Sequence, residues 1–114
     1  MAGVHNFLCE QGATFSRVVS YQGSEGAPVN LSGYTARMQV RATAEDGAVL
    51  LSLTTENGGI TLGTTAGTVT LLATATQTAA MPAGELVYDI ELVAGAVVTR
   101  LLQGCFVVDA EVTR

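Results

Sequence analysis

Two stretches of this chain alternate strictly between apolar and polar residues, and this alternation limits the folds that the chain can adopt. In residues 34–41 the apolar positions are Tyr34, Ala36, Met38 and Val40. In residues 86–93 they are Leu86, Tyr88, Ile90 and Leu92. Successive side chains of a β-strand point to opposite faces, so each stretch predicts a strand with one buried side.

Shorter extended segments, bounded by turns that contain glycine, fill much of the remaining chain. We predict further strands at residues 49–53, 60–62 and 67–73, and a long last strand at 97–112. Asp46-Gly47 and Ala94-Gly95 are predicted to form turns between strands. Gly104 indicates a bulge or a site of close backbone approach in the last strand, which carries Leu102, Phe106 and Val108 on one face.

Residues 74–81 lose the period of two and are rich in alanine. They predict one or two helical turns that Pro82 ends, because proline disfavours helical geometry in the residue before it. The N-terminal third is less regular: Phe7 and Cys9 share one parity, and Arg17 shares the parity of its apolar neighbours Phe15 and Val19. An unpaired buried guanidinium is costly, so we expect a strand end or bulge to move Arg17 outward, or an acid to pair with it.

These elements predict an all-β protein. About seven strands at roughly ten-residue spacing, with one short helical turn near residues 74–81, indicate a two-sheet antiparallel β-sandwich of the immunoglobulin-like type. A small β-barrel is the alternative. Residues 1–114 are interpreted as a single domain, because the length suits one core and no linker or repeat divides the chain.

The composition excludes several classes of protein. Hydrophobic residues make up 48% of the chain and charged residues 13%, against about 25% in typical soluble domains, so disorder driven by charge is excluded. Five arginines oppose ten acidic residues and no lysine is present, so we expect no nucleic-acid partner. We also expect no export signal and no membrane partner, because the N-terminus lacks a basic start and no apolar run is long enough.

The two cysteines, Cys9 and Cys105, lie near opposite ends of the chain. A disulfide between them is geometrically possible if the first and last strands pair. The expected lack of an export signal favours a reducing compartment, and therefore free thiols. Neither cysteine has another thiol or a histidine at metal-ligand spacing, so no metal site is predicted.

Reactive groups are sparse along the chain. His5 is the only histidine, and no motif supplies a nucleophile for it to activate. Cys105 has no adjacent positive charge to stabilise a thiolate. Asp89 and Glu91 share a strand face, as paired carboxylates do in glycoside hydrolysis, but the pattern shows no pocket around them. We therefore expect no enzyme activity, no catalytic residue and no cofactor.

The polar sides of the two alternating stretches form the candidate protein-contact face. Its residues are Arg37, Gln39, Arg41, Asp89 and Glu91. Opposite charges on such a face can pair across strands for under about 1 kcal/mol each. A domain this poor in charge exposes apolar surface or surface rich in Thr and Ala. The chain also has no lysine, a residue that on edge strands hinders pairing with another chain. Oligomerisation or docking into a larger assembly is therefore expected.

Several stretches carry a family resemblance that spans nearly the whole chain. They are EQGATFSR (10–17), VNLSGYTARMQVR (29–41), GAVLLSL (47–53), MPAGELVYDIEL (81–92) and the last strand with Arg100, Gly104 and Phe106. These stretches resemble small virion structural proteins of tailed bacteriophages and prophages. They are similar to the immunoglobulin-like β-sandwich domain that begins many upper baseplate and tail-fibre-associated proteins. Residues 31–34 resemble that family's turn into its second main strand.

The resemblance implies a structural role in the phage particle. In the family this domain anchors a longer receptor-binding part to the tail. We expect no such part after Arg114, and therefore expect an adaptor that docks to other virion proteins at the tail, baseplate or fibre attachment. The protein would be made in the host cytoplasm and reside in the virion as a homo-oligomer or in several copies. The alternatives are a capsid decoration (cement) protein and, from another class, a carbohydrate-binding module or small hydrolase that uses Asp89 and Glu91.

Overall fold

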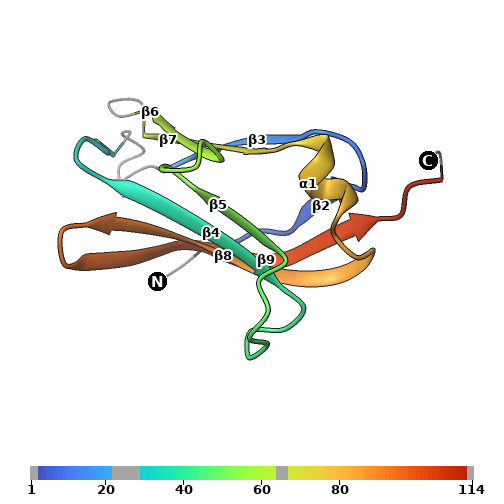
Figure 1. Ribbon diagram of the computed structural model, residues 1–114. Coiled ribbons are helices and arrows are strands. Elements are labelled where there is room, and N and C mark those ends of the chain that lie inside the picture. Colours follow the sequence, from blue (N-terminus) through green and yellow to red (C-terminus); the bar gives the residue numbers. More distant parts are fainter. Residues whose placement is uncertain (1–2, 22–28, 64–66, 113–114) are drawn as a thin grey trace.

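The computed structural model is a sandwich of two β-sheets with a short helix at one end (Figure 1). It describes residues 3–21, 29–63 and 67–112. The elements are β1 (Gly3–Val4), β2 (Phe7–Glu10), β3 (Phe15–Ser20), β4 (Thr35–Arg41), β5 (Leu51–Thr54), β6 (Ile60–Gly63), β7 (Thr68–Ala73), α1 (Ala75–Ala79), β8 (Gly84–Ala94) and β9 (Val97–Asp109). The predicted all-β sandwich is confirmed, and the alternative barrel is not, because the described strands form two separate sheets.

The larger sheet, called sheet A here, has the order β1-β9-β8-β4-β5, and β2 also pairs with β9. The pairs β4–β5, β4–β8 and β8–β9 are antiparallel. In contrast, β1 and β2 run parallel to β9, which corrects the prediction of a wholly antiparallel sandwich. Parallel strands need a long connection between them. Here nearly the whole domain lies between β1 and β2, at the start of the chain, and β9, at its end.

The smaller sheet, sheet B, has the order β3-β7-β6 and is antiparallel throughout. Taken in chain order, β3, β6 and β7 occupy the places of strands B, D and E of an immunoglobulin fold, and β4, β8 and β9 those of C, F and G. The fold is therefore immunoglobulin-like. It differs from a constant-type domain in that its first strand joins the sheet of β9, and β5 extends that sheet beyond β4.

The core lies between the two sheets and is built from the alternating residues. The apolar positions predicted in residues 86–93 are all buried, and so are Ala36, Met38 and Val40 from residues 34–41. Sheet B contributes Val69, Leu71 and Ala73 on β7. An aromatic cluster of Phe7, Phe15, Tyr88 and Phe106 fills one end of the core, with ring centroids 5.0–6.5 Å apart. Such tilted and edge-on pairs add to the free energy of area burial.

The predicted helical turn is α1, which joins the two sheets between β7 and β8. Thr74 and Gln77 form a capping box at its start, and each bonds the other's backbone N–H. The hydroxyl of the fully buried Thr78 accepts from Gly12 N and donates to the carbonyl of Ala13. The helix thereby fastens the β2–β3 turn to the core.

The last strand departs from prediction at two points. It ends at Asp109 rather than at residue 112. The bulge lies at Leu101, because Ile90 pairs with Leu102 but Glu91 pairs with Arg100. Gly104 is instead the site of close backbone approach, since a Cβ atom there would overlap the carbonyl oxygen of His5.

The segment between β1 and β2 is fastened to β9 by bonds around Gly104. The amide of His5 donates to the carbonyl of Gln103 (3.0 Å), and the amide of Cys105 donates to Asn6 Oδ1 (3.0 Å). The Tyr88 hydroxyl reaches the carbonyl of His5 from the core side. Burial raises the pKa of Tyr88 to about 12, with a smaller contribution from Cys105.

Arg17 does point outward and is exposed, but neither a bulge nor a strand end is the cause. Strand β3 pairs with β7 in continuous register through this residue, so no bulge or strand end moves it. Its guanidinium leaves the space between the sheets at the edge of sheet B, where it donates to the carbonyls of Ser16 (2.8 Å) and Leu8 (3.0 Å). It also lies over the Phe15 ring, 4.7 Å from the centroid. Backbone carbonyls and an aromatic ring thus replace the expected acid.

Both cysteines are free, as predicted. Strand β2 does lie beside β9, but Cys9 pairs with Val108 and faces the core, whereas Cys105 pairs with Val87 on the opposite face of sheet A. A disulfide between them would have to cross the sheet. Burial raises the pKa of the Cys9 thiol, and Arg17 opposes this effect.

The predicted turn at Asp46-Gly47 is part of a longer loop, residues 42–50, that joins β4 to β5. Val49 lies in this loop and is 41% exposed, so the strand predicted at residues 49–53 begins only at Leu51. Strand β5 forms an edge of sheet A. The Asn57 side chain covers part of that edge: it donates to the carbonyl of Ser52 (3.1 Å) and accepts from the amide of Thr54 (2.9 Å).

Candidate functional site

The five residues of the candidate contact face lie together on the outer side of sheet A, in rows that cross the strands β4, β8 and β9. The first row is Arg37, Glu91 and Arg100. The second row is Gln39, Asp89 and Gln103. The third row is Arg41, Val87 and Cys105. We call this surface the charged face; it holds three of the chain's five basic residues.

Alternation along the strands places these side chains outward. On β4 the burial alternates from residue to residue, with Ala36, Met38 and Val40 inside. On β8 the same alternation buries Tyr88 and Ile90 and leaves Asp89 and Glu91 on the outer side. The cross-strand register then brings Arg37 opposite Glu91 and Gln39 opposite Asp89.

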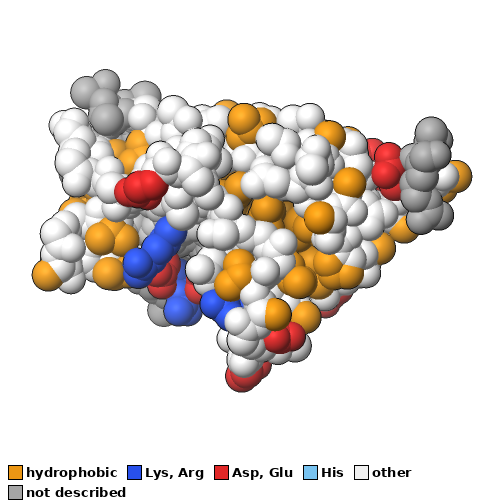
Figure 2. All heavy atoms as spheres, in the orientation of Figure 1, with side chains coloured by type: hydrophobic (Ala, Val, Ile, Leu, Met, Phe, Trp, Pro, Cys, Tyr) orange, Lys and Arg blue, Asp and Glu red, His pale blue; other side chains and the backbone are white. Residues whose placement is uncertain are grey.

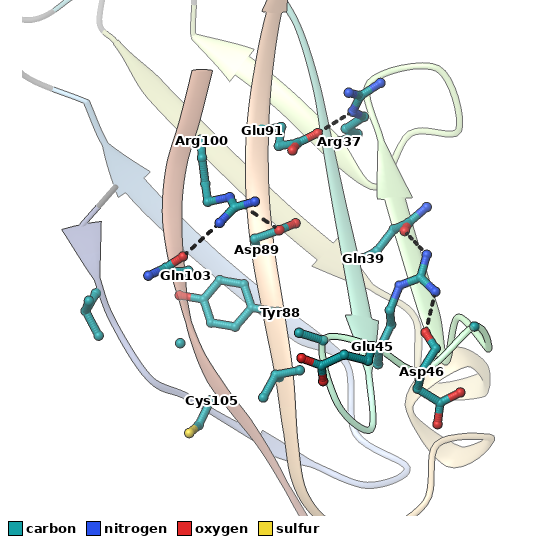
Figure 3. Close-up of a pocket in the computed structure, with 16 residues that line it drawn as sticks. Arg37, Gln39, Glu45, Asp46, Tyr88, Asp89, Glu91, Arg100, Gln103 and Cys105 are labelled. Atoms are coloured by element: carbon teal, nitrogen blue, oxygen red, sulfur yellow. Dashed lines mark hydrogen bonds and ion pairs between the residues drawn. The ribbon is translucent and has the colours of Figure 1, made fainter. Parts of the chain in front are cut away.

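Arginines pair with both carboxylates of the charged face (Figure 3). Arg37 Nε lies 2.7 Å from Glu91 Oε1, and Arg100 Nε lies 3.5 Å from Asp89 Oδ2. Each arginine side chain is 52% exposed, whereas Glu91 is 24% and Asp89 39% exposed. The guanidinium groups therefore form the outer layer of this part of the face, and the carboxylates lie beneath them.

The β4–β5 loop closes one end of the charged face. Arg41 Nη1 donates to the carbonyl of Asp46 (2.7 Å), and Arg41 Nη2 donates to Gln39 Oε1 (2.8 Å). The amide of Ala48 donates to Asp46 Oδ1 (2.9 Å), which fixes the turn. The loop projects beyond the outer side of sheet A (Figure 1), and the space-filling view shows its acidic groups at the tip of the molecule, below the arginines (Figure 2).

The charged face and the loop surround a hollow of about 970 Å³. Figure 3 shows Arg37, Glu91 and Arg100 at one end and Glu45 and Asp46 at the other. The wall also includes Val4 from β1, Ala44 and Gly47 from the loop, and Gly104 and Cys105 from β9. Tyr88 is the aromatic residue among the described lining residues, and it is 4% exposed because its ring packs in the core.

Sequence reasoning found five residues of this face and missed four others with charged or amide side chains. Arg100 and Gln103 were missed because the bulge at Leu101 shifts the parity of β9, so that one even and one odd residue share the outer side. Asp46 was predicted only as part of a turn with Gly47, and Glu45 was not assigned to this face. A signal for them was present: a loop that leaves β4 directly after Arg41 must begin beside that face.

The other candidate residues are not gathered into a reactive site in the part of the chain that the structure describes. His5 is exposed, lies edge-on to Phe7 with ring centroids 4.7 Å apart, and is not among the lining residues of the hollow. Cys105 lines the hollow with Asp89 and Glu91, but both carboxylates are paired with arginine. Among the described residues, no three His, Cys, Asp or Glu side chains are grouped so that they could hold a metal ion.

The outer side of sheet B is chemically different. Its outward residues are Ser16, Val18 and Ser20 on β3, Thr61 and Gly63 on β6, and Thr68, Thr70 and Leu72 on β7. We call this surface the uncharged face. Val18 is 64% and Leu72 41% exposed, so the face combines small hydroxyl side chains with isolated aliphatic ones.

Neither a scan against protein-family models nor a search of curated proteins returns a match for this chain. Within the described residues, no helix has the length and apolar character needed to cross a membrane.

Proposed function

We propose that this protein is a structural docking domain of a tailed-phage particle, an adaptor at the tail, baseplate or fibre attachment, and that the charged face is its contact surface. The observation that carries the proposal is the position of Arg37, Gln39, Arg41, Asp89 and Glu91 around one hollow on the outer side of sheet A. Rows of charged residues with both signs favour one orientation and one register of a partner on a contact surface.

The chemistry of the hollow favours a protein partner over the alternatives. Asp89 and Glu91 each form an ion pair with an arginine, so neither is a free carboxylate facing the hollow. A sugar-binding site would stack its ligand on exposed aromatic rings, whereas Tyr88 turns its ring into the core. Outward guanidinium groups with polar neighbours suit the rim and core of a protein interface.

The phage setting rests on the resemblance in the sequence. Three of the stretches that carry it, residues 29–41, 47–53 and 81–92, contain all or most of β4, β5 and β8. These strands lie side by side in sheet A, and two of them supply the five residues of the candidate contact face. The resemblance and the proposed contact surface thus concern the same part of the molecule.

Site-specific photo-cross-linking in assembled particles tests this proposal. The chain has no lysine, so amine-reactive reagents have few targets on it. A benzophenone amino acid is placed at Gln39 on the charged face or, as the matched control, at Thr61 on the uncharged face. We expect the protein in purified particles, with adducts to a virion protein from position 39 and few from position 61.

Three results would contradict the proposal: absence of the protein from particles, equal adducts from both positions, or adducts from position 61 alone. Copy number from quantitative mass spectrometry separates an adaptor from a capsid decoration protein. An adaptor needs only a few to dozens of copies in a particle, and decoration demands hundreds.

A further inference from the structure

The charges of the charged face change sign along the strand direction. The row of Arg37, Glu91 and Arg100 is net positive, and the row of Asp89 is net negative. The row of Arg41 is again net positive. Beyond it lie Glu45 and Asp46 in the loop and Glu85 on the outer side of β8, which we call the acidic end. Neighbouring rows are two residues, or about 7 Å, apart.

This order of signs is complementary to itself. Consider a two-fold axis that lies in the plane of the face and runs across the strands, between the second and third rows. Rotation about this axis places a second copy against the first, with its rows in the reverse order. The row of Arg37 and Arg100 on one copy then meets the acidic end of the other, and the Asp89 row meets the Arg41 row. Every meeting is between opposite net charges, and a two-fold interface makes each of them twice.

The shape of the face has the same property. The β4–β5 loop projects from one end of the face, and the hollow opens beside it (Figures 1 and 3). Reversal by the two-fold axis carries the loop of each copy over the row of Arg37 of the other. Val4, 74% exposed at the wall of the hollow, adds apolar area next to these charges.

We propose that the partner on the charged face is a second copy of this chain, docked face to face about that two-fold axis. This inference rests on the proposed function, because it names the occupant of the same surface. The copies repel one another at long range, since each carries a formal charge of -5. Ordered charges of opposite sign on one face give this orientation an advantage over random encounters.

Analytical ultracentrifugation of the purified protein tests the proposal. We expect a reversible monomer–dimer equilibrium at about 50 mM NaCl. The association constant should fall at least about tenfold at about 500 mM NaCl, because exposed charges are screened over a few ångströms there. A protein that stays monomeric at millimolar concentration in low salt, or dimerises equally in high salt, would overturn the proposal.

Charge reversal identifies the face. R37E with R100E makes the first row acidic, and E45R with E85R makes the acidic end basic. The side chains of Glu45 and Glu85 make no hydrogen bond within the described residues. Each double variant alone should lose at least about tenfold in self-association. An equimolar mixture of the two should restore a dimer of one copy of each. Failure of the mixture to associate contradicts the proposed orientation.

Two further variants keep the test decisive. R17E reverses an exposed arginine at the edge of sheet B and should leave the dimer unchanged; an equal loss in R17E would show an effect of overall charge. If R37E with R100E does not fold by circular dichroism, R37Q with R100Q replaces it, and unchanged association in that variant overturns the proposal. A strictly monomeric protein whose position 39 still cross-links to another virion protein would retain the docking face and exclude the second copy.

Discussion

The two outer faces of the sandwich are both built from alternate strand residues, but they differ in chemistry. On the charged face, arginine, acid and amide side chains follow one another in rows across β4, β8 and β9. On the uncharged face, serine, threonine and single aliphatic residues take the equivalent outward places of β3, β6 and β7. Because the inner sides of both sheets are apolar and buried, the difference lies entirely in residues that the fold does not need.

This contrast separates what folds the chain from what the chain presents to its surroundings. Alternation alone is enough to bury one side of each strand. The exposed side can then vary between charged and neutral at a small cost in stability, since exposed pairs contribute little. The charged face gathers three of the five basic residues of the chain, although exposed ion pairs contribute little to its stability.

The largest expected effect concerns the core that both sheets share. Met38→Ala in sheet A and Leu71→Ala in sheet B should each lower the free energy of unfolding by about 2–5 kcal/mol, because both side chains are buried and leave a cavity. Chemical denaturation measures the loss. Thr61→Ala, on the uncharged face, is the control and should change it by less than about 0.5 kcal/mol. A large loss in only one sheet would show that the inner sides are not equivalent.

The next effect concerns the N-terminal strands, which only sheet A has. Gly104→Ala should cost about 1–3 kcal/mol, because its Cβ atom would overlap the carbonyl oxygen of His5 and push β1 and β2 from β9. Gly47→Ala is the control, since a Cβ atom there meets no atom within 4 Å among the described residues. Hydrogen exchange should show amides of β1 and β2 losing protection first. Equal stability of the two variants would contradict the close approach.

Tyr88 gives a pH-dependent test of the same attachment. Tyr88→Phe removes the hydrogen bond to His5 and should cost about 1 kcal/mol at neutral pH. The pKa of Tyr88 is about 12 against an ordinary 10.0, so below pH 10 the phenol is protonated in both states. Between pH 10 and 12 the unfolded chain loses this proton and the folded one keeps it, so stability falls as pH rises.

Denaturation midpoints of wild type and Tyr88→Phe across this window measure the contribution. The wild-type protein should lose stability more steeply with rising pH, and the two curves should converge. Parallel curves would show that the folded protein does not hold the phenol in its neutral form.

The smallest expected effect distinguishes the two outer faces directly. Arg37→Ala breaks the ion pair with Glu91 and should cost under about 1 kcal/mol at low salt, and less at high salt. Thr70→Ala on the uncharged face should change stability by a similar amount that salt does not alter. These measurements use dilute, monomeric protein. A salt-independent loss for Arg37→Ala would mean that its packing, and not its charge, stabilises β4.

The sequence predicted those parts of the fold that depend on local pattern. Residues 34–41 and 86–93 follow the period of two, and the structure buries the expected sides. The helical turn before Pro82 and the strand at 67–73 were also predicted, because composition and the positions of glycine and proline are local signals. Pairing between distant segments was not: the parallel attachment of β1 and β2 to β9 leaves no mark on either stretch alone.

Of the nine charged or amide residues described around the hollow, five were predictable for the same reason. Arg37 and Glu91 lie on regular strands, so their parity gave their side of the sheet. Arg100 lies beyond a bulge whose position depends on cross-strand pairing, and Glu45 lies in a loop whose direction depends on packing. The outward direction of Arg17 was one of the two expected outcomes, but its cause was not predicted, because edge position, unlike parity, is a property of the assembled sheet.

The side chain of Asn57 has a consequence for association between molecules. It forms hydrogen bonds with the carbonyl of Ser52 and the amide of Thr54 at the exposed edge of β5. A strand of another molecule could otherwise pair with these backbone groups. Another strand would therefore have to displace the Asn57 side chain before it could pair with β5 at these positions. Association of molecules through β5, which would extend sheet A from one molecule into the next, is therefore disfavoured at Ser52 and Thr54.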